Sequence, residues 1–476
     1  MRLAFSSLCL LLWSCLWSAV CAKSAVGDRI LVVMEDEGQR GEYAQFWKDL
    51  ELRDFKLSFE SPKTEDLSLF RHGELAYEHL ILTPPKSKGY GPSLTPKALL
   101  AFTNAGGNIL LGLSAQSGTP SAISSLLLEL DIALPSDRSA LVVDHFNYDS
   151  ASSPDKHEVL LLPRPGPPRP DVVNFFGGSG LVALPNTVGQ SLGNTSPLLA
   201  PILKASNTAF SYSPAEETDS EAGDDGFATG TQLSLITAMQ ARNSARFTVL
   251  GSLEMLSDKW FNAKVKGNDG KSVATVNREF AQQLTEWAFK EVGVLRVDNV
   301  EHHLIEEGDA AKPAANSTQV GFSNPEIYRI KNDVEFSITL SQWSRDHWAP
   351  FTLPAGDSVQ LEFSMLSPFH RLALSPVRTS VNSTTFATSF TTPDQHGIFA
   401  FKVNYKRPFL TSVEEKRQVT VRHFAHDEYV RSFRIQGAVP WVTGLWGIVV
   451  GWVLFVGVWL YAEPREVRRE KSMVSQ

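Results

Sequence analysis

Apolar positions in the first part of the chain follow two alternating patterns. Residues 30–34 form a short continuous apolar run, which is typical of a strand buried on both faces of a sheet. Tyr43, Phe46, Trp47 and Leu50 then recur with the spacing of one helix face. Further strand patterns occupy residues 56–59, 78–82, 109–113 and 140–143, and helix patterns occupy residues 96–104 and 123–130. This alternation predicts a mainly parallel sheet flanked by helices.

The same alternation returns, less regularly, in residues 151–296. Strand patterns lie at residues 159–162 and 247–250, and Asn277 is placed to cap the N-terminus of a helix that ends before Gly293. The apolar side chains that this helix would bury are Phe280, Leu284, Trp287 and Ala288. We therefore expect a second α/β domain after the first.

Two segments of this second domain have compositions that oppose regular structure. Residues 163–170 contain five prolines in eight positions, which predicts an extended connector, with a proline-docking motif as the alternative. Residues 216–225 carry six carboxylates and no basic side chain. We expect a solvated loop there instead of a calcium site, because the spacing fits no EF-hand.

From residue 297 onward, short strand patterns replace the alternation. They occupy residues 328–340, 358–366, 371–374, 384–390, 397–405 and 418–424, separated by proline, glycine, asparagine and serine. Such a series predicts an antiparallel β-sandwich, which we place at residues 297–435. Its last strands lead into an apolar segment, so the sandwich is expected close to a membrane.

Both ends of the chain carry apolar segments that predict its topology. Residues 439–461 contain 23 positions without a charge; at about 1.5 Å per helical residue they span about 35 Å, enough to cross a bilayer core. Residues 1–22 have a basic residue, an apolar run and small side chains at Val20 and Ala22, as a signal peptide does. Cleavage after Ala22 gives a type I protein. Its parts are domains at residues 23–150, 151–296 and 297–435, the membrane helix, and a cytosolic tail at residues 462–476.

Composition narrows the function classes. The formal net charge is −8, and an acidic chain lacks the basic face that nucleic-acid binding needs. All three cysteines, Cys9, Cys15 and Cys21, lie in the predicted signal peptide. The mature chain would therefore have no disulfide, thiol nucleophile or thiolate metal site.

Two glycine motifs match functional patterns but lack the required context. Residues 189–193 fit G-x-S-x-G around Ser191, yet Pro197 opposes the prompt helix that a nucleophile elbow needs. Residues 178–183 fit G-x-G-x-x-A, but Pro185 stops the helix that would hold a pyrophosphate. We favour a turn for the second motif and keep a serine hydrolase at Ser191 as a minor alternative.

Histidine pairs give no stronger indication of a metal site. His302 and His303 lie between predicted domains and are interpreted as a surface pair. His423 and His426 fall in a predicted strand, where a spacing of three places them on opposite faces. We expect no catalytic residue, metal ligand or cofactor site in this chain.

A polar cluster follows the strand pattern at residues 140–143. It comprises Asp144, His145, Asn147, Tyr148 and Asp149. Open α/β sheets place ligands at the carboxyl ends of their strands, so the cluster is a candidate binding site. The alternative is a hydrogen-bonded turn that joins the first domain to the second.

Two further sets of residues bear on modification and assembly. N-x-S/T sequons stand at Asn194, Asn316 and Asn382, on the side of the membrane where N-glycosylation occurs. Gly447 and Gly451 form a G-x-x-x-G motif in the membrane segment, which lets another helix backbone approach closely. We expect this helix to pack in a larger assembly, with a plain anchor in membrane lipid as the alternative.

Several separated motifs, together with the topology, resemble the family of the 48 kDa subunit of oligosaccharyltransferase. They are the strand at residues 30–34 with its helix, AGGNIL at 105–110, VVDHFNYD at 142–149, GSLEMLSD at 251–258, and the helix and strand at 277–297. The likeness covers nearly the whole chain in order. Phe146 departs from it, because a second histidine is expected there, and the tail has no lysine-based retrieval signal.

The resemblance implies a role in protein N-glycosylation. It implies membership of the endoplasmic reticulum complex that transfers a preassembled oligosaccharide from dolichyl diphosphate to asparagine in N-x-S/T sequons. The subunit would be accessory, with the catalytic site on another subunit, so the implied partners are the other subunits of the complex. The first domain is implied to be amidotransferase-like, with Ser114 where such a sheet carries a cysteine. The alternative is a lumenal carbohydrate-binding receptor or chaperone-like protein.

Overall fold

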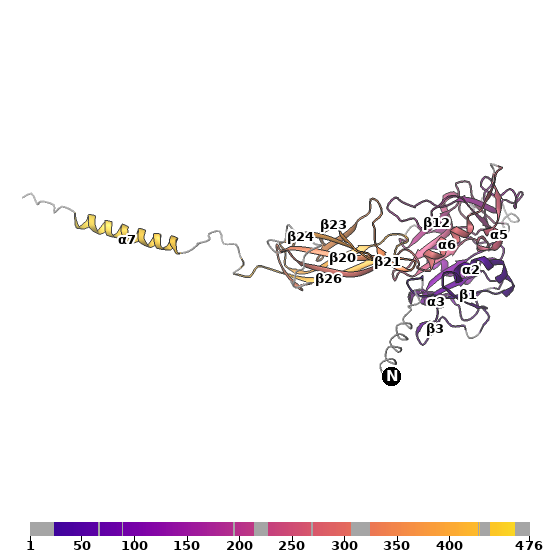
Figure 1. The fold of residues 1–476 in the computed structure, drawn as a ribbon, viewed down its shortest axis with the longest axis horizontal. Coiled ribbons are helices and arrows are strands. Elements are labelled where there is room, and N and C mark those ends of the chain that lie inside the picture. The colour runs from indigo at the N-terminus through magenta and orange to yellow at the C-terminus, as the bar shows by residue number, and fades with distance from the viewer. Residues whose placement is uncertain are drawn as a thin grey trace, which may run out of the picture. The chain divides into compact units, whose positions relative to one another are not determined.

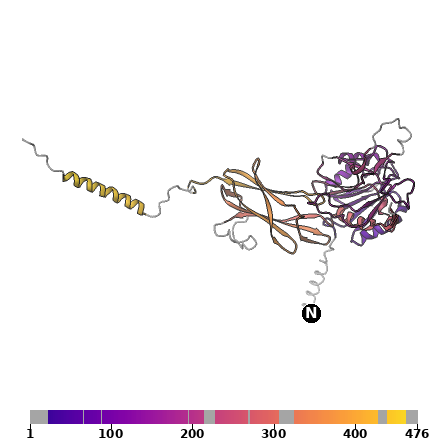
Figure 2. The ribbon, with the colours of Figure 1, turned by 90° about the horizontal axis from the view of Figure 1, so that it is seen from above.

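The computed structural model describes residues 23–64, 67–87, 89–193, 196–213, 227–267, 270–305, 324–426, 428 and 438–461 (Figure 1). The chain divides into one unit that extends to Arg422 and a second that begins at His423. The first unit contains a helix-covered sheet, coloured indigo to pink in Figures 1 and 2, and a strand-rich sheet, coloured mainly orange.

Five parallel strands form one part of the first sheet, in the order β2-β1-β5-β6-β15. They are β1 (Arg29–Val33), β2 (Lys56–Glu60), β5 (His79–Leu82), β6 (Asn108–Gly112) and β15 (Arg246–Leu250). Four antiparallel strands extend the sheet: β14 (Leu233–Gln240), β11 (Gln190–Leu192), β12 (Leu199–Lys204) and β7 (Ile132–Ala133). The inner parallel strands are almost completely buried, as continuous apolar runs predict, because helices cover both faces.

Two apolar cores lie on the two faces of this sheet. Helices α2 (Ala44–Glu51) and α6 (Asn277–Ala288) pack in one core, and α3 (Pro96–Asn104) and α4 (Ser121–Glu129) pack in the other. The side chains predicted to line the inner faces of α2 and α6 are all buried, so both amphipathic patterns are confirmed. Short elements complete the α/β part: η1 (Glu37–Tyr43), η3 (Gly230–Gln232), η4 (Glu254–Leu256), α5 (Asp258–Phe261), and the strand pairs β3 (Phe70–Arg71) with β4 (Glu74–Leu75), β9 (Val159–Pro163) with β10 (Leu181–Pro185), and β16 (Lys264–Lys266) with β17 (Ser272–Ala274).

Long-range pairing differs from the sequence expectation at three points. Strand β15 joins β6, so the expected boundary between residues 150 and 151 does not separate two sheets. Strand β8 (Leu141–Val143) lies outside the parallel sheet and pairs antiparallel with β13 (Phe210–Tyr212). Asn277 is the first residue of α6 and not its N-cap; its buried side chain donates to the carbonyls of Ala183 and Met255 and accepts from the Ala183 N–H.

The second sheet has nine strands in the order β18-β20-β24-β23-β22-β25-β26-β19, with β21 beside β20. They are β18 (Val294–Leu304), β19 (Ile327–Arg329), β20 (Asp333–Ser344), β21 (His347–Pro350), β22 (Val359–Ser364), β23 (Pro368–Thr379), β24 (Thr384–Thr391), β25 (Gly397–Tyr405) and β26 (Val413–Arg422). Phe336 of β20 and Phe401 of β25 stack with ring centroids 5.3 Å apart, although three strands separate them in the pairing order. The sheet therefore bends so that its two halves face each other across an aromatic core. The strand expected at residues 328–340 is two strands, β19 and β20, because a turn at Lys331 with φ 59° interrupts it.

The second unit contains the helix α7 (Val439–Leu460). Its 22 residues are long and apolar enough to cross a membrane. The membrane segment predicted at residues 439–461 therefore coincides with a helix, except that the helix ends one residue earlier. The expected signal peptide, the acidic loop at residues 216–225 and the tail lie outside the described residues.

Candidate functional site

A cavity of about 500 Å³ lies at the carboxyl edge of the parallel strands. Its walls come from segments that follow β1, β5, β6 and β15, which is where open α/β sheets bind ligands. Ser114 follows β6, is buried, and its Oγ donates to Glu254 Oε1 at 2.9 Å. The other oxygen of Glu254 accepts from Asn186 Nδ2 at 2.6 Å.

Ser114 and Glu254 hold two loops together at this cavity. Their hydrogen bond joins the loop after β6 to the η4 segment, and the second oxygen of Glu254 is occupied by Asn186. No histidine is among the residues of the described chain that line the cavity.

The two glycine motifs form strands and turns. Ser191 lies inside β11, paired with Ala133 and Leu233, and not at a strand-to-helix elbow. The motif at residues 178–183 leads into strand β10, so no helix begins there to hold a phosphate. The serine hydrolase alternative and the dinucleotide pattern therefore lack the geometry that each requires.

Of the two histidines expected as a surface pair, His302 is buried in the second sheet and His303 is partly exposed. His302 lies in β18, is buried, stacks on Phe401 with ring centroids 4.8 Å apart, and has Nδ1 2.6 Å from the hydroxyl of Tyr328. Burial lowers the pKa of His302 to about 4, so the ring is neutral at physiological pH. The surface interpretation is wrong for His302, because alternation in β18 turns it toward the core while His303 approaches Glu335 at 3.7 Å.

The second histidine pair lies beyond the strand in which it was expected. Strand β26 ends at Arg422, before His423 and His426. Among the residues that the structure describes, no group of three or more histidine, cysteine, aspartate or glutamate side chains is placed to hold a metal ion.

The polar cluster at residues 144–149 is hydrogen-bonded to other parts of the chain. Asp144 is buried and accepts from the Phe146 N–H at 2.8 Å, from Thr208 Oγ1 at 2.8 Å and from Ser206 Oγ. Burial raises the pKa of Asp144, but these bonds and one from Asn147 outweigh that effect and bring the pKa below its usual value. The carboxylate is therefore charged, and it is held both by its own loop and by the segment that carries Ser206 and Thr208.

The remaining members of the cluster contact neighbouring loops. Asp149 accepts from the Lys266 N–H at 2.7 Å, which joins the cluster to β16. The Nδ1 atoms of His145 and His157 lie 2.6 Å apart, and Tyr148 stacks on His157 with centroids 3.8 Å apart. Asp144 and Asp149 therefore bond to residues of the predicted second domain, as expected for the alternative in which a turn joins the first domain to the second.

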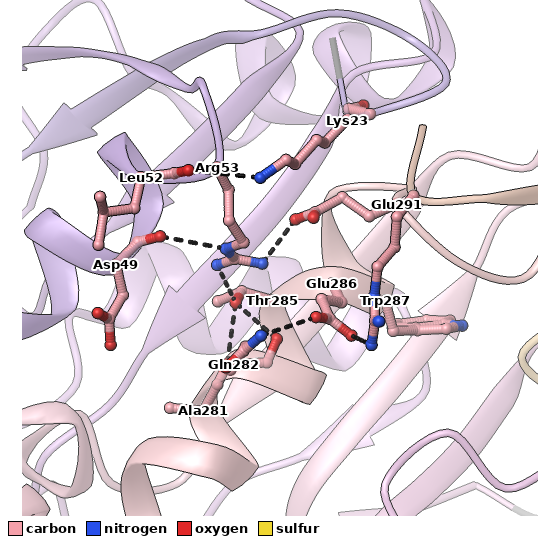
Figure 3. Close-up of polar contacts among 12 residues, drawn as sticks. Lys23, Asp49, Leu52, Arg53, Ala281, Gln282, Thr285, Glu286, Trp287 and Glu291 are labelled. Atoms are coloured by element: carbon pink, nitrogen blue, oxygen red, sulfur yellow. Dashed lines mark hydrogen bonds and ion pairs between the residues drawn. The ribbon is translucent and has the colours of Figure 1, made fainter. Parts of the chain in front are cut away.

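A buried ionic group that the sequence did not reveal joins the first helix to the last helix of the α/β domain (Figure 3). Arg53, just after α2, places Nη1 2.6 Å from Glu291 Oε1 and donates from Nη2 to Thr285 Oγ1 at 2.7 Å. The side chain of Glu291 is fully buried, and burial raises its pKa to about 7 although the charge of Arg53 opposes the rise. No local spacing could predict this pair, because its partners lie 238 positions apart.

The same region connects the α/β domain to the second sheet. Arg345 lies in the turn between β20 and β21: its N–H donates to the Glu291 carbonyl at 2.9 Å, and its guanidinium lies 3.1 Å from Glu286 Oε2. Trp287 Nε1 donates to the carbonyl of Phe409 at 2.8 Å. These bonds make the end of α6 the structural junction between the two sheets.

The sequon that the structure describes and the two glycines of the G-x-x-x-G motif lie in different parts of the chain. Asn382 lies at an exposed turn between β23 and β24, whereas Asn194 and Asn316 lie outside the described residues. Gly447 and Gly451 lie on α7, and apart from adjacent residues and the helix's own backbone, no described atom comes within 4 Å of where a β-carbon would stand.

Comparisons with known proteins agree over nearly the whole chain. The family described as OST48, N-terminal domain, matches residues 21–291, and the family described as OST48 middle domain matches residues 313–463. The chain is 33% identical over 460 residues to the dolichyl-diphosphooligosaccharide–protein glycosyltransferase subunit wbp1 of Schizosaccharomyces pombe, covering 96% of this chain and 97% of that protein. It is 33% identical to the 48 kDa subunit of Danio rerio, covering 94% and 95%, and 31% identical to that of Arabidopsis thaliana, covering 91% and 92%.

Proposed function

The chain belongs to the OST48 family, and from this membership we propose that it is an accessory, non-catalytic subunit of the oligosaccharyltransferase complex. In this role it supports transfer of an oligosaccharide from dolichyl diphosphate to asparagine in N-x-S/T sequons. Its partners are the other subunits, including the one that carries the catalytic site. The similarity to named subunits across both sheets and the membrane segment carries this proposal.

The chemistry of the α/β domain supports the non-catalytic part. Transfer to an asparagine amide needs a site that binds a diphosphate leaving group, and the cavity at the carboxyl edge has carboxylates at Glu42, Glu254 and Asp258 with one cation, Lys259. Such a surface repels phosphate. The domain fits an amidotransferase-like sheet used as a scaffold, and the bent second sheet fits a β-sandwich.

We extend the proposal to topology and assembly. The chain is a single-pass type I protein of the endoplasmic reticulum membrane, with residues 1–22 removed as a signal peptide and both sheets in the lumen. Helix α7 contacts membrane lipid on part of its surface and packs through Gly447 and Gly451 against a helix of another subunit. The basic residues of the tail favour a cytosolic C-terminus.

Purification of the tagged full-length chain in mild detergent tests the subunit role. We expect it to co-purify with other subunits and with activity on an N-x-T peptide, and we expect its depletion to lower glycosylation of a reporter. Ser114→Ala should leave the activity of the purified complex unchanged. Migration as a free monomer, with normal reporter glycosylation after depletion, would contradict the subunit role; loss of activity in Ser114→Ala would contradict the non-catalytic role.

A further inference from the structure

The turn between β23 and β24 presents the sequon Asn382-Ser383-Thr384 in an unusual way. Asn382 is exposed, and its neighbour Val381 has an exposed fraction of 87%. Thr384 is only 4% exposed and is the first residue of β24. The asparagine of the sequon is therefore accessible in the folded protein, while the hydroxyl-bearing residue is not.

Thr384 is held on both sides by backbone pairing. It lies opposite Leu340 of β20 and opposite Thr379 of β23. Its Oγ1 is buried and has no hydrogen-bond partner among the described residues. A buried, unpaired hydroxyl is destabilising, so the folded structure gains nothing from threonine over the isosteric valine. The hydroxyl at this position lacks a role in the folded state.

We propose that Asn382 is N-glycosylated and that the oligosaccharide is added before β24 pairs with β20 and β23. In this step Asn382 Nδ2 forms a bond to C1 of the oligosaccharide and releases one proton to water, while the bond from C1 to the diphosphate oxygen breaks, its electron pair stays on that oxygen, and dolichyl diphosphate leaves. A transferase that reads N-x-T must contact both Asn382 and Thr384, and the folded hairpin offers only the first. The proposal rests on the lumenal orientation proposed above.

The order of synthesis leaves time for this reaction. Strand β26 ends at Arg422, 38 residues after Thr384. At about 5–20 residues per second, those residues take about 2–8 s to emerge. The facing halves of the second sheet need Phe401 of β25, which is made after the sequon. Until then β24 can separate from its neighbours, and each new copy of the chain is a substrate of complexes assembled earlier.

Three variants of the full-length chain in its native membrane test the site. Occupancy is measured on the peptide that contains Asn382, because Asn194 and Asn316 are sequons as well. We expect Thr384→Ser to keep an endoglycosidase-sensitive glycan on this peptide, and Thr384→Val and Asn382→Gln to reduce it at least tenfold. Because valine removes an unpaired buried hydroxyl, Thr384→Val should unfold at the same or a higher temperature than the equally unglycosylated Asn382→Gln. A glycan at Asn382 that persists in Thr384→Val would overturn the proposal.

A delayed supply of lipid-linked donor tests the order of events. The chain is translated into microsomes depleted of the donor, which is restored either during synthesis or after the chain is complete. We expect at least tenfold lower occupancy of Asn382 in the second case; equal occupancy overturns the order. Protection of the second sheet from added protease in sealed microsomes checks orientation separately. A protected but never modified Asn382 refutes this site, whereas a digested domain refutes the lumenal orientation.

Discussion

Replacing Arg53 with methionine should leave Glu291 as a buried carboxyl group without its guanidinium partner. The two side chains are 10% and 0% exposed and lie 2.6 Å apart, so water cannot replace the lost contact. Removing one partner of a buried ion pair costs about 3–5 kcal/mol. A matched change in an exposed pair, Arg371→Met, removes a contact of 3.4 Å to Glu362 and should cost less than about 1 kcal/mol, because the Arg371 side chain is 62% exposed.

The cost of Arg53→Met should depend on pH in a defined direction. Burial already raises the pKa of Glu291 to about 7, and loss of the neighbouring cation raises it further. A carboxyl with a raised pKa in the folded state stabilises the fold below its unfolded pKa and loses that contribution as pH rises through the folded pKa. The deficit relative to wild type should therefore grow from pH 6 to pH 8, by up to about 1.4 kcal/mol per pH unit.

Thermal unfolding of the full-length protein in detergent, followed by circular dichroism, measures this effect. At about 2–4 °C per kcal/mol, Arg53→Met should lower the midpoint by about 6–20 °C. The double variant Arg53→Met, Glu291→Leu should recover most of the loss, since an apolar pair of similar volume replaces the ions. A midpoint for Arg53→Met equal to that of Arg371→Met, or a deficit independent of pH, would refute the reasoning.

Three further predictions concern other regions. Gly447→Leu with Gly451→Leu should reduce co-purification of other subunits severalfold, whereas Val449→Leu on the same helix should not; equal recovery would identify α7 as a plain anchor. Burial lowers the pKa of His79 to about 3, so the unfolded chain takes up a proton at a higher pH than the folded chain does. The free energy of unfolding of the wild-type chain should therefore fall by up to about 1.4 kcal/mol per pH unit as pH drops below about 6.5. His79→Gln should lack this pH dependence in acid-unfolding measurements. Asp144→Asn should lower the free energy of unfolding in urea by about 1–3 kcal/mol, because the new NH₂ group would face the hydroxyl donors of Ser206 and Thr208. If the change instead abolishes glycan binding without unfolding the protein, the cluster is a ligand site.

The candidate site was only partly predictable from sequence. The residues of the cluster at 144–149 follow a strand, as expected, but their partners Ser206, Thr208 and Lys266 lie about sixty to about one hundred and twenty positions away. The cluster does not stand at the carboxyl end of a parallel strand, because β8 leaves the parallel sheet to pair with β13. At that edge of the sheet, a cavity is lined by the segments after β1, β5, β6 and β15.

The elements that have local signals could be predicted from the order of residues alone. The faces of α2 and α6, the apolar strands β1 and β6, and the span α7 follow from periodicity and length, because burial of one face or of a whole segment requires a matching pattern of side chains. Pairing between distant segments became evident only in the folded chain. It brought β15 beside β6 to make one sheet from two predicted domains, joined Arg53 to Glu291, and turned His302 and Thr384 inward. These outcomes depend on which distant strands and charged side chains are buried against one another, and the local sequence pattern carries no information about such distant partners.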